Sequence, residues 1–126
     1  MTLLQKLVRM KAADDNGYVS CVSCGITKRY NDGMQGGHFI NKGSSSRWAL
    51  DQRNVWPQCA GCNLFKMNGG VANISYTYFM TDMYGRDFVE HMKDTAPQPV
   101  KLSTQDYRDM VADLKSQIKE QEARIG

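Results

Sequence analysis

The chain has 126 residues, of which 41% are hydrophobic and 23% are charged, with a net charge of +3. This length suits a single domain, and the balance of apolar and charged residues excludes a disordered chain. No apolar run is long enough to cross a bilayer, and the N-terminal stretch lacks the continuous apolar core of a secretory signal. We therefore expect no membrane association and a cytoplasmic location.

The positive charge is concentrated in one part of the chain. Between Cys21 and Lys66, six cations and two acids give a balance of +4, whereas all other residues together sum to −1. Such a concentration is typical of a surface that faces phosphates. A solvated basic face explains the charge equally well.

The N-terminal half predicts helices and short strands in alternation. Residues 2–13 carry apolar side chains on one face only and predict an amphipathic helix. The stretch YVSCVSCG, residues 18–25, predicts a short strand that enters a tight turn, in which Gly25 is free to take a positive φ. The stretch MQGGHFINKG, residues 34–43, is consistent with a hairpin whose first strand carries His38.

A second strand and a helix follow this hairpin. Val55 and Trp56 predict a short strand. After a turn, a helix is predicted from near Ala60 to Asn68-Gly69-Gly70, where the glycines end it.

The C-terminal half predicts helices only. Residues 73–85 and 86–92 predict two helices that break at Gly85, and His91 in the second is expected to be structural or surface-exposed. Pro97 and Pro99 predict an extended linker. We accordingly divide the chain into a domain of residues 1–96 and a C-terminal segment of residues 97–126.

A final helix is predicted after Ser103, which is its N-cap. Its apolar residues follow a three-to-four spacing: Tyr107, Met110, Val111, Leu114, Ile118 and Ile125. This stripe could be a coiled-coil seam between the subunits of a homodimer. It could equally pack against the core of its own chain.

All four cysteines fall in two Cys-x-x-Cys pairs, Cys21 with Cys24 and Cys59 with Cys62. In a cytosolic chain, paired knuckles of this spacing usually bind Zn²⁺, and four thiolates leave no open position, so the predicted site is structural. A redox dithiol is the competing interpretation, but no thioredoxin-like βαβ pattern surrounds either pair. Two ligands from a knuckle and two from the first turn of a helix make a treble-clef arrangement.

The stretch from the first cysteine pair to the residue after the second contains a histidine and two asparagines suited to phosphodiester hydrolysis. A neutral imidazole at His38 can accept a proton from water near pH 7. Asn63, just after the second pair, offers an oxygen ligand to a hard divalent cation, and Asn54 can orient the imidazole or its loop. Each also has an ordinary explanation: His38 as a packed or surface residue, Asn63 as a helix cap and Asn54 as a turn residue.

The stretches CVSCG, GGHF and QCAGCN resemble the HNH, or ββα-metal, nucleases in a His-Asn-Asn version. More closely, residues 18–70 resemble the lambdoid phage NinG proteins, also called Rap, which are endonucleases of branched recombination DNA such as Holliday junctions. The arrangement is also similar to that of the phage resolvase endonuclease VII. The resemblance implies an α+β fold with a treble-clef, zinc-stabilised ββα-metal core between N- and C-terminal helices.

The resemblance also implies the role of each site residue. His38 would be the general base, Asn63 a ligand of a catalytic Mg²⁺ or Mn²⁺, and Asn54 an orienting residue. Many nucleases of this class place a metal-binding Asp directly before the histidine, where this chain has Gly37. Gln35 or Asp51 could supply the missing ligand, or His38 could itself bind the cation.

Branched DNA is the partner that the resemblance implies, within the cytoplasm of a host cell if a phage encodes the chain. Four basic side chains of the same segment are candidates for phosphate contacts: Lys42, Arg47, Arg53 and Lys66. The competing hypothesis is a zinc-stabilised DNA-binding module without catalytic activity.

Overall fold

The structure is a computed structural model that describes residues 2–67 and 70–125. The elements along the chain are α1 (Thr2–Ala12), β1 (Tyr18–Ser20), β2 (Thr27–Arg29), β3 (Met34–His38), α2 (Ser46–Ala49), the 3₁₀ turn η1 (Gln52–Asn54), β4 (Val55–Cys59), the π-helical turn η2 (Cys62–Lys66), α3 (Val71–Tyr84), α4 (Arg86–Thr95) and α5 (Thr104–Ile125). The chain is thus a mixed α+β protein, as the sequence predicts.

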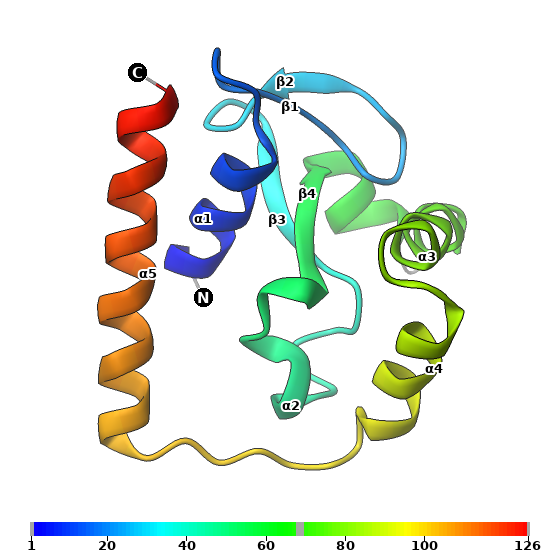
Figure 1. Ribbon diagram of the computed structural model, residues 1–126. Helices are drawn as coiled ribbons and strands as arrows, with labels where there is room; N and C mark the ends of the chain where they lie inside the picture. The colour runs from blue at the N-terminus through cyan, green and yellow to red at the C-terminus, as the bar shows by residue number, and fades with distance from the viewer. Residues whose placement is uncertain (1, 68–69, 126) are drawn as a thin grey trace.

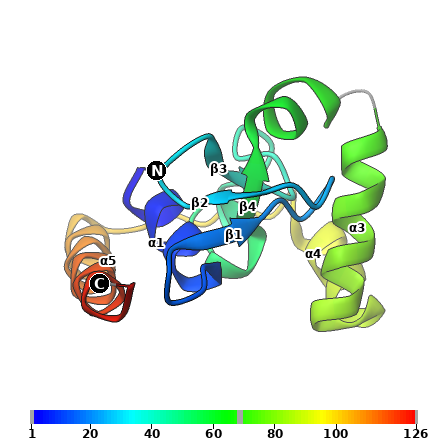
Figure 2. The same cartoon turned by 90° about the horizontal axis from the view of Figure 1, so that it is seen from above.

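The strands form two separate antiparallel hairpins. β1 pairs with β2, and Ser20 lies opposite Thr27. β3 pairs with β4, which places Gly37 opposite Trp56 and His38 opposite Val55. Figure 1 shows the β3–β4 hairpin in the centre of the molecule, between α1 and α5 on one side and α3 and α4 on the other. The view from above in Figure 2 has the same order.

The predicted hairpin within residues 34–43 is corrected by this pairing. The first strand carries His38 as predicted and ends there, but its partner is β4, which extends past Trp56 to Cys59. The intervening loop is closed by its own hydrogen bonds: the backbone N–H of Phe39 donates to the carbonyl of Asn54 at 2.8 Å. The Phe39 N–H is therefore not available for strand pairing within residues 34–43, which a local hairpin would need.

α1 has the amphipathic character that its sequence predicts. Its apolar side chains Leu4, Leu7, Val8 and Met10 are buried, and Val55 of β4 belongs to the same cluster. Burying apolar surface on this side of the hairpin stabilises a helix that would be marginal alone.

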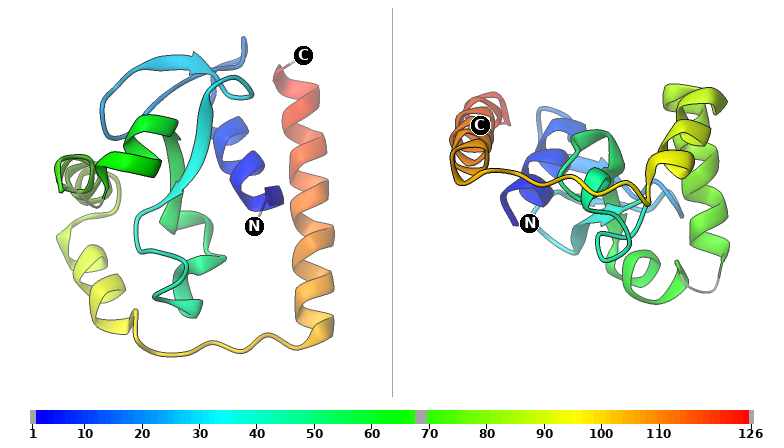
Figure 3. Two further views of the ribbon diagram at one scale, coloured as in Figure 1. Left: turned by 180° about the vertical axis from the view of Figure 1, so that it is seen from behind. Right: turned by 90° about the horizontal axis from the view of Figure 1, so that it is seen from below.

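The apolar stripe of α5 packs against its own chain. Leu114 and Ile118 are buried in the α1 cluster, and α1 and α5 lie side by side in Figures 1 and 3. This contact joins residues on both sides of the division predicted near residue 97, and it uses the stripe that a coiled-coil dimer would need. The homodimer stays a prediction.

The start of α5 confirms the predicted N-cap. The Ser103 hydroxyl accepts a hydrogen bond from the Asp106 N–H at 3.0 Å, and the Asp106 carboxylate accepts one from the Ser103 N–H at 3.1 Å. This reciprocal pair satisfies two N–H groups at the helix start. The extended segment before it runs from α4 to α5 along one end of the molecule (Figure 3).

α3 and α4 cover the other face of the hairpin and break at Gly85, as predicted. Gly85 has a φ of +88°, a value that a residue with a Cβ rarely adopts. Tyr76 and Met80 of α3 are buried against Trp48 and Met92. The predicted helix after Ala60 begins there, but its predicted end at Asn68 and Gly69 lies outside the described residues.

Within residues 2–67 and 70–125, no helix combines the length and the apolarity that crossing a membrane requires.

Candidate functional site

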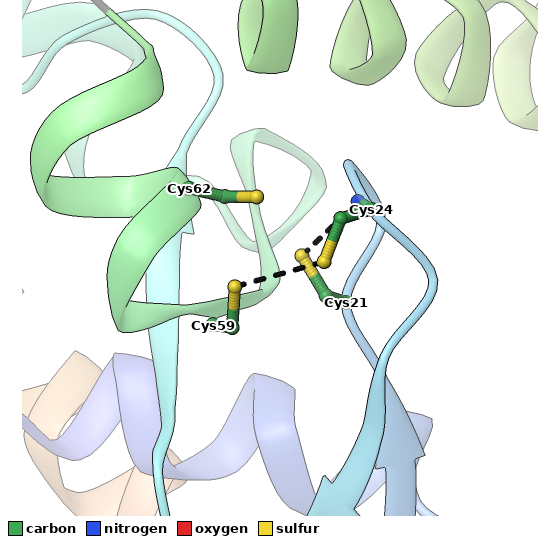
Figure 4. A group of neighbouring side chains, drawn as sticks. All are labelled: Cys21, Cys24, Cys59 and Cys62. Carbon is green, nitrogen blue, oxygen red and sulfur yellow. Dashed lines mark hydrogen bonds between the residues drawn. The ribbon is translucent and has the colours of Figure 1, made fainter.

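The four cysteines come from two places in the fold and meet in one cluster (Figure 4). Cys21 and Cys24 lie at the tip of the β1–β2 hairpin, whereas Cys59 ends β4 and Cys62 begins η2. The tip is a tight turn in which Gly25 has a φ of +80° and donates its N–H to the Cys21 carbonyl at 2.9 Å. The positive φ predicted for Gly25 is thus confirmed.

The sulfur positions fit a tetrahedral metal. All four Sγ atoms lie within 4.8 Å of one another, and those of Cys24 and Cys59 are 3.7 Å apart. Four thiolates about 2.3 Å from a tetrahedral Zn²⁺ would be separated by about 3.8 Å. The four cysteines are free, and 3.7 Å is far longer than a disulfide bond. The cluster is therefore compatible with a structural metal site such as zinc.

Hydrogen bonds support a thiolate at Cys59, whereas the pKa values of Cys24 and Cys62 are raised. The Cys21 sulfur accepts hydrogen bonds from the backbone N–H groups of Ser23 at 3.4 Å and Cys24 at 3.5 Å. Burial alone would raise the pKa of the Cys59 thiol, but hydrogen bonds from the Cys62 backbone and the neighbouring thiols lower it to about 7. A metal bound here would tie the β1–β2 hairpin to the junction of β4 and η2.

His38 is the last residue of β3 and is half-buried. Its Nε2 lies 2.8 Å from the carbonyl oxygen of Ala49. Because a carbonyl can only accept, Nε2 carries the proton, and the lone pair of the neutral ring is on Nδ1. Burial lowers the pKa of His38 below its ordinary value, and the positive charge of Lys42 acts in the same direction. The imidazole is therefore neutral, and able to accept a proton, at pH 7.

Asn54 is fully buried and organises the loop that follows His38. Its Oδ1 accepts a hydrogen bond from the Ile40 N–H at 2.8 Å, and its Nδ2 donates to the carbonyls of Ile40 at 3.0 Å and Trp48 at 3.1 Å. Trp48 directly precedes Ala49, the hydrogen-bond partner of the imidazole. The Asn54 side chain therefore contacts the loop that follows His38 and not the imidazole ring.

Asn63 lies in η2 and points toward β3 rather than capping its own helix. Its Nδ2 donates a hydrogen bond of 2.7 Å to Oε1 of Gln35. Asn63, His38 and Lys42 all line one open groove of about 420 Å³, which Gln5 of α1 also borders. The structure thus brings together the histidine and the asparagine that the sequence singles out.

Gly37 cannot be replaced by a residue with a side chain, such as Asp, without rearrangement. A Cβ at this position would lie 1.8 Å from Oε1 of Gln58. Gln58 is fully buried opposite Gln35, and its Nε2 donates to the Ser23 hydroxyl at 2.8 Å. Its Oε1 has no hydrogen-bond partner among the described residues. The role of Gln58 could not be predicted from the sequence, because nothing in its local pattern indicates burial.

The other candidate ligands have different surroundings. Asp51 forms a two-pronged pair with Arg53, with contacts of 3.0 and 2.8 Å, and it is not among the side chains that line the groove. This pairing lowers the pKa of Asp51 although burial opposes it. Gln35 uses its oxygen to hold Asn63.

The four predicted phosphate contacts are spread over the surface. Lys42 is exposed and lines the groove, whereas Arg47 borders a neighbouring cavity that Lys42 shares. Lys66 is exposed at the end of η2. Arg53 lies over the ring of Phe88, 4.9 Å from its centroid, away from the groove.

His91 is exposed, and its ring centroid lies 6.0 Å from that of Trp48. It does not border the groove that contains His38.

Comparison with known proteins identifies a family but no individual relative. Searches of curated proteins and of solved structures returned no match. The sequence model of the family described as "Bacteriophage Lambda NinG protein" matches residues 2–124, nearly the whole chain. The chain therefore belongs to the bacteriophage lambda NinG protein family.

Proposed function

We propose that the protein is a metal-dependent endonuclease that hydrolyses phosphodiester bonds in branched DNA, such as Holliday junctions. The observation that carries the proposal is the shared groove of His38 and Asn63. The two residues come from a strand and a helical turn, and the intervening β4 ends in the cysteine cluster. This order of elements supports a treble-clef, HNH-type ββα-metal core.

His38 has the geometry of a general base. Its Nε2–H is held by the Ala49 carbonyl, so the ring cannot turn freely and Nδ1 keeps its lone pair. In the proposed reaction, Nδ1 accepts a proton from the water that attacks the scissile phosphorus. The bond from phosphorus to the leaving oxygen breaks as the bond to the water oxygen forms. Asn54 supports this arrangement through the backbone of the loop.

The amide oxygen of Asn63 suits a hard divalent cation. When bound there, Mg²⁺ or Mn²⁺ would supply positive charge to the phosphate and its leaving oxygen. The Gln58 side chain occupies the space that a side chain at position 37 would need. This supports a cation site whose protein ligands do not include the Asp that related nucleases place before the histidine.

The basic side chains nearest the groove support a nucleic acid as the substrate. Lys42 borders the groove and, with Arg47, also the neighbouring cavity. A DNA strand bound in the groove would therefore meet two cations in succession. If several phosphates are contacted, the affinity for DNA should fall steeply as the salt concentration rises. The preference for branched over linear DNA rests on the family resemblance alone.

A His38→Gln substitution tests the proposal. Gln can still donate a hydrogen bond to the Ala49 carbonyl, but it cannot act as a base. We expect cleavage of a synthetic four-way junction in Mg²⁺ or Mn²⁺ to fall by about 10²-fold or more. Junction binding, measured by gel shift in Ca²⁺, should change little.

His91→Gln is the matched control, because it makes the same change at the other, exposed histidine. Cleavage by this variant should equal that of the wild-type protein. Undiminished cleavage by His38→Gln would show that the assigned base is wrong. Junction binding by a wild-type protein that cleaves no branched, single-stranded or linear DNA would instead support the non-catalytic DNA-binding module.

A further inference from the structure

The amide of Asn63 is held in one orientation by a residue of the neighbouring strand. An Asn side chain ends in an oxygen that accepts hydrogen bonds and a nitrogen that donates them, and the two exchange places when the amide turns over. In this structure, Nδ2 donates to Oε1 of Gln35 at 2.7 Å. No described residue donates a hydrogen bond to the Asn63 Oδ1, which lies on the side of the amide away from Gln35.

Both residues of this hydrogen bond lie on backbone segments that other interactions hold in place. Gln35 lies within β3, where it is paired opposite Gln58 of β4. Asn63 directly follows Cys62, whose sulfur belongs to the four-cysteine cluster. A metal in that cluster would fix the start of η2 relative to β4, and the β3–β4 pairing fixes Gln35 relative to the same strand.

We propose that Gln35 is a positioning residue, which presents the Asn63 amide oxygen, and not its NH₂ group, to a divalent cation in the groove. This inference rests on the proposed function, because it deepens the role of Asn63 there. The electrostatic reason is direct: a carbonyl oxygen attracts a cation, whereas an NH₂ group in the same place repels it. Gln35 thus acts through Asn63 and is not itself a ligand.

The role assigned to Gln35 predicts different effects for two substitutions. Gln35→Met keeps a similar length and shape but removes the acceptor, so the Asn63 amide is free to turn over. Gln35→Glu keeps an acceptor at the same position and cannot donate, so it holds the Asn63 NH₂ group in the same orientation. If Gln35 were instead the donor in this pair, Gln35→Glu would force the Asn63 amide to turn over, because a carboxylate can only accept a hydrogen bond.

The first measurement is the binding of Mn²⁺ alone to the zinc-loaded, full-length protein, followed by electron paramagnetic resonance. We expect Gln35→Met to weaken Mn²⁺ binding by about 10–100-fold, the usual effect of removing a residue that orients a metal ligand. Gln35→Glu should bind Mn²⁺ at least as tightly as the wild-type protein. The Mn²⁺ concentration for half-maximal junction cleavage should shift in the same order.

Gln5→Met is the matched control. Gln5 borders the same groove, but its Nε2 donates to the Gly36 carbonyl at 3.2 Å rather than to Asn63. The control variant should bind Mn²⁺ as the wild-type protein does. Wild-type Mn²⁺ affinity in Gln35→Met, or equal losses in Gln35→Met and Gln35→Glu, would overturn the proposal.

These outcomes are separable from those of the proposed function. If His38→Gln abolishes cleavage while Gln35→Met binds Mn²⁺ normally, the nuclease stands and the role of Gln35 is wrong. If the wild-type protein cleaves no DNA but Gln35→Met still loses Mn²⁺, the amide pair stands and the nuclease is wrong. A wild-type protein that binds no Mn²⁺ would overturn both the cation site and the role of Gln35.

Discussion

Replacing Gly37 by alanine should destabilise the protein through one contact. The added Cβ would lie 1.8 Å from Oε1 and 2.7 Å from Cδ of Gln58, and neither distance is possible between unbonded atoms. Gln58 is fully buried and donates to the Ser23 hydroxyl at 2.8 Å, so it cannot move aside without losing that hydrogen bond. Losing a buried hydrogen bond costs about 1–3 kcal/mol, and overpacking costs a similar amount.

We therefore expect Gly37→Ala to lower the free energy of unfolding by about 2–4 kcal/mol, since the two effects overlap in part. In urea, with a slope of about 2 kcal/mol per molar, the midpoint of unfolding should fall by about 1–2 M. Circular dichroism or tryptophan fluorescence would measure it. Gly61→Ala is the control, because a Cβ there meets no atom of the described part of the chain within 4 Å, and the midpoint should not fall.

A double-mutant cycle isolates the contact itself. Gln58→Ala empties the space beside Gly37, so adding Gly37→Ala in this background should cost almost nothing. If Gly37→Ala is harmless in the wild-type protein, or costs the same in both backgrounds, then Gln58 is not what requires a glycine at this position.

Three further predictions concern the cysteine cluster, the loop and the base. Purified protein should contain about one zinc per chain by elemental analysis, and Cys59→Ser should lose most of the zinc and lower the melting temperature; a full zinc complement in the variant would contradict the four-sulfur site. Asn54→Ala removes the three hydrogen bonds that this fully buried side chain makes with the loop backbone and should lower the free energy of unfolding by about 2–4 kcal/mol in urea, whereas an unchanged midpoint would contradict its role. Because burial and the charge of Lys42 lower the pKa of His38, the neutral base forms at lower pH than usual, so cleavage should rise with pH through a midpoint below 6.5. Lys42→Gln should move this midpoint upward, and a midpoint that stays in place would contradict the interaction.

The metal cluster was predictable because its signal is local. Each Cys-x-x-Cys pair specifies its own tight turn, and the positive φ of Gly25 agrees with that turn. A metal then needs only that the two pairs meet, which the tetrahedral preference of four thiolates favours. The break at Gly85 and the N-cap at Ser103 were predictable for the same reason, since each depends on neighbouring residues in the chain.

The arrangement around His38 was predictable only in part. The sequence indicated which residue types could act together, and the structure places His38 and Asn63 in one groove. The sequence did not indicate that the Ala49 carbonyl would accept a hydrogen bond from the imidazole, or that Gln35 would accept one from Asn63. Both contacts depend on the pairing of β3 with β4, and the local pattern of residues 34–43 suggested a different partner for β3.

Short-range geometry and periodicity specify the cysteine turns, the helix boundaries set by Gly85 and Ser103, and the amphipathic face of α1, so these features could be read from neighbouring residues alone. The burial of the α5 apolar stripe against α1, and the exclusion of a side chain at position 37 by Gln58, became evident only from the folded chain. Burial and steric exclusion of this kind arise between segments that are distant in the chain. Neither segment contains a local sequence signal that indicates the other segment as its partner.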